Sequence, residues 1–385
     1  MIRPETAQES AFRAEVRAWF EQNLPQHLRN LTFRPEPKEA MPWYVALYKK
    51  GWIAPHWPKA FGGMGASGAE QVILFEESVR IGVPDIPTQG LNHIGPLLMN
   101  LGTPEQQAYH LPRILSGEGV WCQGYSEPGS GSDLASVQTS GEVRGNQIII
   151  NGQKIWTTWG HHANWMYALV RTIPGEKKKN GITFVLLDMN TKGITRRPIR
   201  TIAGDDEFCE VFFEDVAVPL SNVVGEIDQG WRVATSLLDE ERIRIGTPLL
   251  PLRALARLRA VTKFNGLSEE AEWRRRIARS EIAVETVTAA YFQCLERFES
   301  GNAAGGESSY LKILATEVTQ EIVDLVQQAA GALRAVKVAD AGSDARVDFS
   351  EMYLQSRRLS IYGGSNEIQR SILAAQVLGL QGARK

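Results

Sequence analysis

The spacing of apolar residues changes twice along this 385-residue chain. From residue 5 to about residue 115, apolar side chains recur every three or four positions, as on amphipathic helices. From Val120 to Pro219, β-branched and aromatic residues gather in short runs of strand length. Helical spacing returns at Gly230. Because helices and strands are segregated rather than alternating, the chain is predicted to be an α+β multidomain protein without βαβ units.

Within the helical parts, the spacing predicts individual helices over the ranges 5–24, 39–50, 69–82, 230–246, 268–299, 308–333 and 348–360, with a last helix from Asn366. Within the β part, Asn151-Gly152 stands between β-branched runs, which predicts a two-residue hairpin turn. The charged stretch GEKKKNG (175–181) is predicted to be a solvated hairpin tip.

Composition and charge exclude several classes of protein. The formal net charge of -2 gives no reason to expect a nucleic acid or an acidic membrane as partner. No apolar run approaches the roughly 20 residues that span a bilayer, and the first residues lack the apolar core of a secretory signal. Three widely separated cysteines suggest a reducing compartment and no metal site. We therefore expect a cytoplasmic protein without membrane insertion.

Two segments of the β part could hold a flat polar ligand. WCQGYSEPGSGSD (121–133) is rich in glycine and hydroxyl residues, so its backbone N–H groups could face a ligand, although the segment taken alone is better explained as a surface turn. Its glycines do not follow a strand and open a helix, so the dinucleotide-binding fingerprint is absent. KIWTTWGHHANW (154–165) offers aromatic faces beside hydroxyls, which suits a heterocycle, but the tryptophans could also fill the domain core.

A third candidate is a single carboxylate in the segment GWRVATSLLDEERIRIG. Trp231, Ala234, Leu238 and Ile245 form an apolar stripe, and the gap in this stripe is Glu241. A carboxylate among apolar residues is unfavourable unless it is paired or functional. An ion pair with a nearby arginine is the structural alternative. The neighbouring Glu240 lies off the stripe and is expected to face water.

Together these segments resemble the acyl-CoA dehydrogenase family along the whole chain. YSEPGSGSD is similar to the family's flavin loop, GQKIWTT to its flavin-contacting strand, EFCEVFFEDVAVP to its Glu-Val-x-Phe signature, QQAAGA to its Gln-x-x-Gly-Gly turn and SIYGGSNEIQR to its Ile-Tyr-x-Gly motif. The resemblance implies an N-terminal all-α domain (1–118), a middle antiparallel β domain (119–226) and a C-terminal four-helix-bundle domain (227–385).

The resemblance also implies FAD as the cofactor and an acyl-CoA as the substrate. The implied flavin contacts are Tyr125, Ser126, Ser132, Trp156, Thr157, Thr158, Gln328, Ser365 and Glu367. The implied substrate contacts are Ser132, Arg242, Tyr362 and Gly364. The family reaction removes the α-proton of the thioester with a base while the β-hydrogen leaves as hydride. Electrons would then pass to an electron-transfer flavoprotein, and the protein would be a homotetramer active in fatty acid β-oxidation or related lipid metabolism.

The catalytic residues implied by the resemblance are Glu241 and Gly363. Many family members carry the catalytic glutamate directly after the tyrosine of the Ile-Tyr-x-Gly motif, where this chain has Gly363. Isovaleryl and long-chain members instead carry it on the helix that holds Glu241 here. The backbone N–H of Gly363 could still donate a hydrogen bond to the thioester oxygen.

The chain departs from the family where subunits meet on the cofactor. Only KFNG (263–266) matches the Arg-x-x-Phe-Gly segment, without its arginine, and Ala332 replaces the second glycine after Gln328. Two alternatives to a homomeric dehydrogenase therefore stay open. One is a flavin monooxygenase or oxidase on the same fold, and the other is one subunit of a hetero-oligomeric dehydrogenase. The sequence does not indicate the acyl group.

Overall fold

A computed structural model describes residues 4–31, 34–174, 179–299, 306–335, 337–339 and 346–380. The chain divides into two compact units. Unit 1 consists of Met1–Glu36, Gly65–Asp85 and Glu241–Lys385, and unit 2 consists of Pro37–Met64 and Ile86–Glu240. Helix α6 (Gly230–Ile245) contributes residues to both units.

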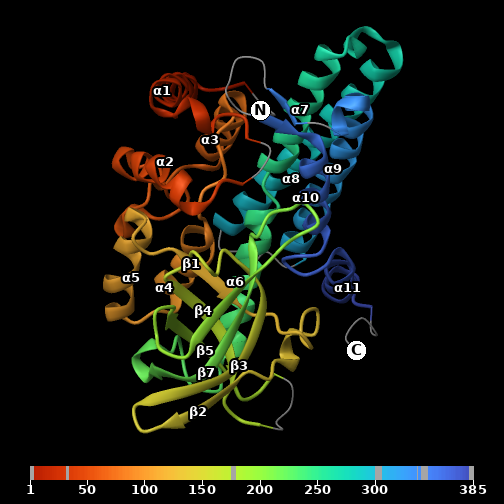
Figure 1. The fold of residues 1–385 in the computed structure, drawn as a ribbon. Helices are drawn as coiled ribbons and strands as arrows, with labels where there is room; N and C mark the ends of the chain where they lie inside the picture. The colour runs from red at the N-terminus through yellow and green to blue at the C-terminus, as the bar shows by residue number, and fades with distance from the viewer. Residues whose placement is uncertain are drawn as a thin grey trace. The chain divides into compact units, whose positions relative to one another are not determined.

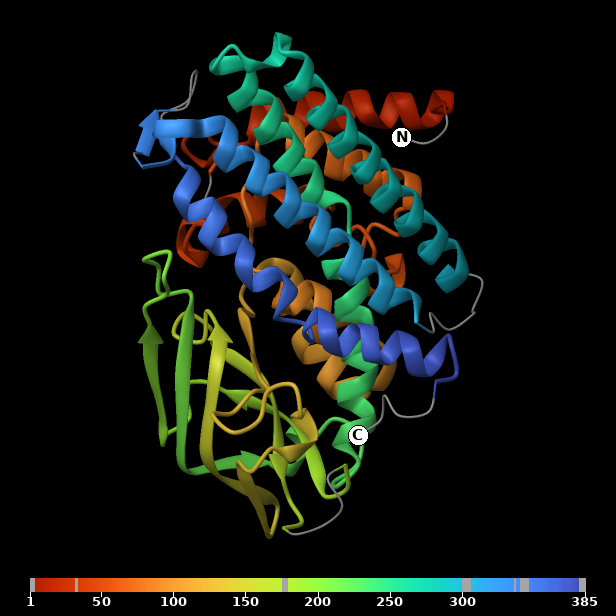
Figure 2. The same ribbon diagram turned by 90° about the vertical axis from the view of Figure 1, so that its right-hand side faces the viewer.

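Unit 1 is built from helices. Its helices are α1 (Ala7–Asn23), α3 (Gly68–Ile81), α7 (Leu249–Phe264), α8 (Ala271–Glu299), α9 (Glu307–Ala330), α10 (Phe349–Ser356) and α11 (Asn366–Gln376). The long helices α7, α8 and α9 run alongside one another (Figure 2). Their facing apolar residues, among them Leu258, Val287 and Ile322, form one buried core. A short ladder, β8 (Lys337–Ala339) with β9 (Arg346–Asp348), completes the unit.

Helix α7 was not among the helices predicted from sequence. Pro248 precedes it and Pro251 lies in its first turn, and prolines there suggest a break in a helical pattern when the sequence is read alone. Proline is nevertheless tolerated in the first turn, because the N–H groups of that turn have no partner within the helix. The other predicted helices are present with shifts of a few residues at their ends.

Helices α1 and α3 are joined by a buried ion cluster. The Glu77 carboxylate receives hydrogen bonds from Arg13 at 3.1 Å, from Arg17 at 2.8 Å and from Arg80 at 2.6 Å. Burial alone would raise the pKa of Glu77, but the hydrogen bonds from Arg17, Arg80 and Arg13 outweigh it and lower the pKa to about 2. The cluster is therefore charged at neutral pH and links the two helices.

Unit 2 combines short helices with a curved sheet (Figure 1). Its helices are α2 (Pro37–Lys50), a π-helical turn (Gly90–Ile94), α4 (Gly95–Leu101) and α5 (Pro104–Ser116). Its strands are β1 (Trp121–Gly124), β2 (Ser140–Arg144), β3 (Gln147–Thr158), β4 (Trp165–Arg171), β5 (Ile182–Asp188), β6 (Ile194–Ile199) and β7 (Phe208–Pro219).

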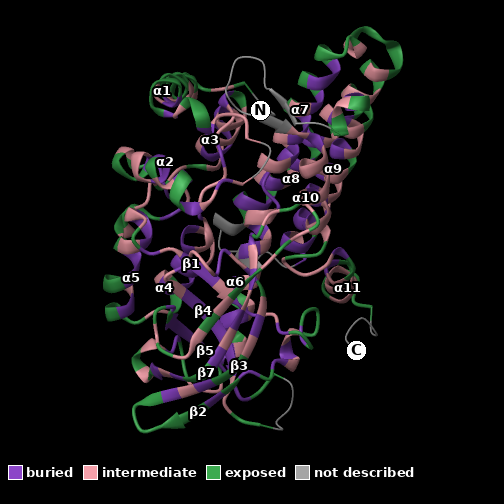
Figure 3. Cartoon of the chain, viewed as in Figure 1, coloured by how far each residue is buried: buried purple, intermediate pink, exposed green. Residues whose placement is uncertain are grey.

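The strands of unit 2 pair in the order β1-β4-β2-β3-β7-β6, and β5 pairs with β4. Most pairs are antiparallel, as expected, but β4 pairs in parallel with both β1 and β2. Strands β4 and β5 are buried along nearly their full length (Figure 3). They contribute Met166, Ala168, Val185 and Leu187 to the core.

The predicted hairpin turn at Asn151-Gly152 is wrong. Strand β3 continues through this pair, and the turn between β2 and β3 lies at Arg144–Gln147 instead. The register shifts between Ile150 and Gly152, so the pair forms a β-bulge. The Asn151 side chain donates to Asp215 Oδ1 at 3.0 Å and accepts from the Asp215 N–H at 2.8 Å. These bonds to β7 satisfy the donor and acceptor groups of the Asn151 side chain, so no turn is needed at this position.

The order of helical, β and helical segments confirms the predicted fold class. The predicted hairpin tip falls largely on residues 175–178, which lie outside the described part of the chain. A search of the described residues finds no helix with the length and hydropathy needed to cross a bilayer.

Candidate active site

Glu241 lies on the buried side of helix α6. Its exposed fraction is only 5%, and Leu237 and Ala234, one and two turns earlier respectively, are fully buried. Two residues later, Ile243 packs in an apolar cluster with Val72 of α3 and Leu311 of α9. The C-terminal part of α6 is therefore fixed within unit 1, and the position of Glu241 is fixed with it. The side chain of Glu240 lies outside the described part.

The turn Gly363-Gly364 lies opposite Glu241. Both glycines have positive φ, +64° and +81°, a region that other residues rarely adopt. A Cβ atom on Gly363 would lie 3.6 Å from Glu241 Oε1 and 2.4 Å from Ile245 Cδ1. The structure thus brings together the two predicted catalytic positions, which are more than one hundred residues apart in sequence, and leaves no room for a side chain at 363.

Two buried side chains hold this turn from behind. Lys312 of α9 donates to the Gly364 carbonyl at 2.9 Å and to Asn366 Oδ1 at 2.7 Å. Gln369 of α11 donates to the Gly363 carbonyl at 3.0 Å and accepts from Ser309 at 2.7 Å. Both carbonyls of the double glycine are therefore fixed by groups on separate helices.

Lys312 was not singled out from the sequence, although its side chain is fully buried. Burial lowers its pKa to about 8, and the opposing attraction of Glu367, Glu241 and Glu317 limits the shift. An ammonium group in an apolar helix is costly unless it is hydrogen-bonded. A lysine about four helical turns before the Gln-x-x-Gly turn looks like a surface residue in the sequence, and only its distant partners reveal its role.

The Gly363 N–H could donate a hydrogen bond to a ligand. Within the described residues, no oxygen accepts a hydrogen bond from it. Next in the chain, the Ser365 hydroxyl accepts from the Ile368 N–H at 3.4 Å and so caps α11, while Glu367 is exposed in the first turn. The N-terminal end of α11 and the Gly363 N–H thus both present donors, as an oxyanion or a phosphate requires.

In unit 2, the glycine-rich loop is fixed to strand β3. Lys154 is fully buried and its Nζ lies 2.7 Å from Glu127 Oε1 and 3.2 Å from the Tyr125 carbonyl. Glu127 also accepts from the N–H groups of Gln138 and Thr139. Burial lowers the pKa of Lys154 to about 8 against the attraction of Glu127. The loop is therefore a positioned structure rather than a loose surface turn.

The end of β3 carries the two side chains that best fit a flavin. Trp156 has φ +59° and is 58% exposed, so a large aromatic face is presented at a strained backbone position. Thr157 is 1% exposed, and its Oγ1 has no hydrogen-bond partner within the described residues. An exposed ring beside an unsatisfied buried hydroxyl suits a flat heterocycle with polar edges.

Two interpretations of these tryptophans were made from the sequence, namely aromatic faces for a ligand and side chains that fill the domain core. Trp159 is buried, and Trp165 stacks on Trp121 with ring centroids 5.5 Å apart. These residues fill the interior of unit 2, as the structural interpretation predicts. Only Trp156 is exposed enough to stack on a ligand.

The remaining predicted flavin contacts have varied environments. The Tyr125 ring is buried against Tyr167 and Phe184. The Ser126 carbonyl accepts from the Ile155 N–H at 2.9 Å, which ties the loop to β3. Ser132 is exposed, Thr158 is partly buried, and the Gln328 side chain is exposed and accepts a hydrogen bond from Arg276 at 2.8 Å.

The predicted substrate contacts of unit 1 lie near the base. Arg242 follows Glu241 on α6 and is partly buried. Tyr362 precedes Gly363 and is 36% exposed, and Lys312 holds the carbonyl of Gly364. The structure therefore places Glu241, Gly363 and Gly364 around one point within unit 1.

Comparison with protein families finds three adjoining matches. The N-terminal domain of acyl-CoA dehydrogenases matches residues 6–118, the middle domain matches residues 122–216, and the C-terminal domain matches residues 228–378.

Individual relatives match over nearly the whole chain. The acyl-CoA dehydrogenase IpdE1 of Mycobacterium tuberculosis is 35% identical, covering 96% of this chain and 97% of that protein. FadE26 of the same organism is 31% identical, covering 99% of both. Among solved structures, the Tcur3481-Tcur3483 steroid ACAD superposes with a TM-score of 0.87 at 32% identity, covering 99% of both chains. The ChsE4-ChsE5 complex from M. tuberculosis superposes with a TM-score of 0.81 at 29% identity, covering 98% of both chains.

Proposed function

We propose that this chain desaturates an acyl-CoA thioester between the α and β carbons of the acyl group, with Glu241 as the base. The premise is that the chain belongs to the acyl-CoA dehydrogenase family. The chain is an acyl-CoA dehydrogenase, and FAD is the cofactor of its family. The observation that carries the assignment of the base is the position of the Glu241 carboxylate, 3.6 Å from the Cβ position of Gly363.

In this proposal the protein performs two tasks at the thioester. The Glu241 carboxylate accepts the α-proton, and the Gly363 N–H donates to the thioester oxygen on which negative charge develops. Lys312 and Gln369 hold the carbonyls of the turn, so the N–H keeps its direction while charge builds up. Arg242 and Tyr362 contact the acyl-CoA beside the base.

The residues at the end of β3 fit the cofactor. Trp156 would stack on the ring system and Thr157 would hydrogen-bond its edge, which satisfies the buried hydroxyl. FAD supplies a two-electron acceptor for the β-hydrogen. The further contacts we propose are Tyr125, Ser126, Ser132, Thr158, Gln328, Ser365 and Glu367. An electron-transfer flavoprotein is the proposed acceptor of the electrons.

The proposed substrates are acyl-CoA thioesters with a bulky or ring-bearing acyl group. The steroid ACAD relative supports this class. The experiment is anaerobic mixing of the FAD-loaded protein with straight, branched and ring-bearing acyl-CoA thioesters, followed by flavin absorbance. Bleaching by a thioester supports the dehydrogenase. Oxygen consumption without anaerobic bleaching would instead indicate an oxidase.

For the assembly, we propose that this chain pairs with a second, related chain. In a homotetramer each subunit would complete its neighbour's FAD site, yet this chain lacks the arginine before KFNG and has Ala332 in place of a glycine. Both structural relatives named above are described as pairs of different chains. The test is light scattering, which measures the mass of the assembly. It is applied to this chain alone and to this chain co-expressed with a related acyl-CoA dehydrogenase chain. A homotetramer that retains FAD and turns over would overturn it.

A further inference from the structure

Two carbonyl groups of the glycine-rich loop in unit 2 are held by neighbouring residues of strand β3. Lys154 Nζ lies 3.2 Å from the Tyr125 carbonyl oxygen, and the Ile155 N–H donates to the Ser126 carbonyl at 2.9 Å. The peptide groups on both sides of Ser126 are therefore fixed to β3. Because a trans peptide group is planar, its N–H points opposite to its carbonyl. Lys154 thus also fixes the direction of the Ser126 N–H.

The loop meets β3 directly before the side chains that best fit a flavin. Ile155, which binds the Ser126 carbonyl, is followed by Trp156 and Thr157, the exposed ring and the buried hydroxyl described above. Ser126 is only partly buried, so a ligand can reach its polar groups. One stretch of β3 therefore positions both the loop and the aromatic face.

Glu127 balances the charge of Lys154 and closes the loop. Glu127 Oε1 lies 2.7 Å from Lys154 Nζ. The same carboxylate accepts from the N–H groups of Gln138 at 2.6 Å and Thr139 at 2.9 Å. The main chain of Glu127 also exchanges two hydrogen bonds with that of Ser130. The charged pair therefore connects the start of the loop with its far end.

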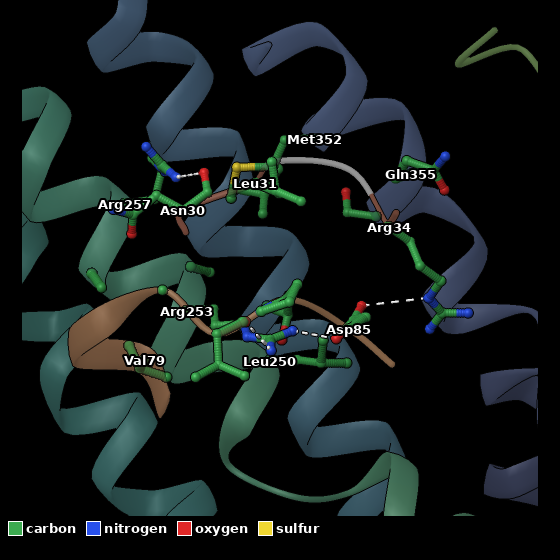
Figure 4. A pocket seen from close by; sticks show the side chains of 18 of the residues that line it. Asn30, Leu31, Arg34, Val79, Asp85, Leu250, Arg253, Arg257, Met352 and Gln355 are labelled. Atoms are coloured by element: carbon green, nitrogen blue, oxygen red, sulfur yellow. Dashed lines mark hydrogen bonds and ion pairs between the residues drawn. The ribbon is translucent and has the colours of Figure 1, made fainter. Parts of the chain in front are cut away.

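The ion pairs of unit 1 offer a comparison. Arg34, Arg253 and Asp85 line a cavity of about 460 Å³ (Figure 4). Arg253 Nη1 lies 2.5 Å from Asp85 Oδ1, and Arg34 Nε lies 3.5 Å from Asp85 Oδ2. The side chains of Arg253 and Asp85 are 26% and 33% exposed, so water still solvates their charges. The Lys154 side chain is 0% exposed. Its pair with Glu127 carries a desolvation cost that the pair in unit 1 largely escapes.

We propose that Lys154 is a positioning residue for the flavin, because it holds the Tyr125 carbonyl so that the Ser126 N–H faces the edge of the ring. The inference rests on the FAD site proposed above. A pair that served stability alone could be replaced by neutral side chains, since removing both members of a buried ion pair is often neutral for folding. An ammonium group bonded to the carbonyl has a further effect, because it polarises the peptide and strengthens its N–H as a donor.

The reduction potential of the bound flavin distinguishes this role from a purely structural one. Reduction places negative charge on the ring, and a hydrogen bond to a charged acceptor is stronger than one to a neutral acceptor. A donor at the ring edge therefore binds reduced FAD more tightly than oxidised FAD and raises the potential. General loosening of the loop would weaken the binding of both forms equally and leave the potential unchanged.

The test variant is Lys154→Met combined with Glu127→Gln. It removes both charges, while the glutamine oxygen can still accept from the N–H groups of Gln138 and Thr139. The matched control is Arg144→Met combined with Glu142→Gln on β2. That pair has a similar contact of 2.6 Å, but its side chains are 60% and 63% exposed and lie outside the proposed site.

Three measurements are made on the full chain, or on its complex with the partner chain proposed above. Absorbance titration gives the affinity for oxidised FAD, which should fall about tenfold in the test variant. Anaerobic equilibration with a reference dye gives the potential. We expect it to fall by about 30 mV, which corresponds to a further tenfold loss of affinity for reduced FAD. Thermal melting of the apoprotein should differ little from wild type. The control variant should keep the wild-type affinity and potential.

A fourth measurement requires no variant. Tyr125-Ser126 is the only Tyr-Ser pair in the sequence. Tyrosine labelled with ¹³C at its carbonyl and serine labelled with ¹⁵N therefore mark the Ser126 amide alone in a magnetic resonance spectrum. Adding FAD to the labelled wild-type protein should shift this signal and slow the hydrogen exchange of the amide by about tenfold or more.

The remaining outcomes overturn the inference. A test variant that loses affinity for FAD but keeps the wild-type potential shows that the pair only stabilises the loop. A test variant with wild-type affinity and potential shows that the pair does not act on the flavin. A Ser126 amide that does not respond to FAD in the wild-type protein refutes the inference whether or not the variant folds, and leaves the proposed FAD site intact. Failure of the wild-type protein to bind FAD refutes the proposed function together with the inference.

Discussion

Glu241 Oε1 lies 3.6 Å from the position that a Cβ atom on Gly363 would occupy. Family members that carry their glutamate after the tyrosine would have its first side-chain carbon at this position. The carboxylate from α6 thus reaches the same region from the other side. In the proposed mechanism the base therefore keeps its location in space, while its location in the chain differs by more than one hundred residues.

The first prediction concerns the base. Glu241→Gln should reduce the rate of anaerobic flavin bleaching by about 10²- to 10⁴-fold, because the amide keeps the shape of the side chain but cannot accept a proton. Affinity for FAD and for the acyl-CoA should be unchanged. Glu240→Gln serves as the control and should change the rate of flavin bleaching only slightly. Near-wild-type bleaching in the Glu241 variant would show that another group is the base.

The second prediction concerns the turn. Gly363→Ala should lower the free energy of unfolding by about 2–3 kcal/mol and reduce turnover, because alanine at positive φ is strained and its Cβ would lie 2.4 Å from Ile245 Cδ1. The matched control is Gly266→Ala, where φ is +70° and no atom lies within 4 Å of the new Cβ. The control should cost only about 1 kcal/mol. Equal costs in chemical denaturation would exclude the contact with Ile245 as the cause.

The third prediction concerns the buried lysine. Lys312→Met should destabilise the protein by about 1–3 kcal/mol, because the Gly364 carbonyl and Asn366 lose their donor. It should also lower kcat/KM by loosening the turn beside Glu241. The exposed Lys263 on α7 provides the control, and Lys263→Met should change stability by less than about 0.5 kcal/mol. A fully stable and active Lys312 variant would refute its positioning role.

The fourth prediction is a pH dependence that follows from the same residue. Its folded-state pKa of about 8 lies below the ordinary value of 10.5. Between these two values the unfolded chain holds a proton that the folded chain has lost, so the contribution of Lys312 to stability rises as the pH rises through this window. Denaturation of the wild-type protein and the Met variant at several pH values isolates this rise. Parallel curves for the two proteins would contradict the buried position of the ammonium group.

The fifth prediction separates the tryptophans. Trp156→Ala should weaken FAD binding about tenfold by removing the stacking face, yet leave the melting temperature of the apoprotein nearly unchanged, because the ring is mostly exposed. Trp159→Ala, in contrast, should destabilise the apoprotein by about 3–5 kcal/mol, since Trp159 is buried. Absorbance titration with FAD and thermal melting provide the two measurements. A Trp156 variant with wild-type affinity for FAD would remove this residue from the site.

The fold class and the burial of Glu241 could be predicted because both depend on local periodicity. The apolar stripe of α6 has only one gap, and a helix turns that gap toward the interior whatever its partners are. The hairpin at Asn151-Gly152 could not be judged in the same way. Its local pattern suits a turn, but the pairing of Asn151 with Asp215 on β7 decides that the strand continues.

The arginines of the cavity and Lys312 gave no signal in the sequence. Charged residues on helices usually face water, and the sequence shows no difference between Arg257, which lines the cavity, and Arg259, which does not. Burial of Lys312 depends on α11, which follows it by about fifty residues. Such contacts between distant segments decide which charged residues enter an interior, and no local pattern records them.

The double-glycine turn has consequences for the order in which this protein matures. Its two carbonyls are held by Lys312 of α9 and Gln369 of α11, and glycine by itself favours no single conformation. The turn therefore acquires its shape only when α11 has docked. A nascent chain that stops before Asn366 would build the bundle of α7, α8 and α9 but could not present the Gly363 N–H. Competence for the proposed reaction thus depends on the docking of α11.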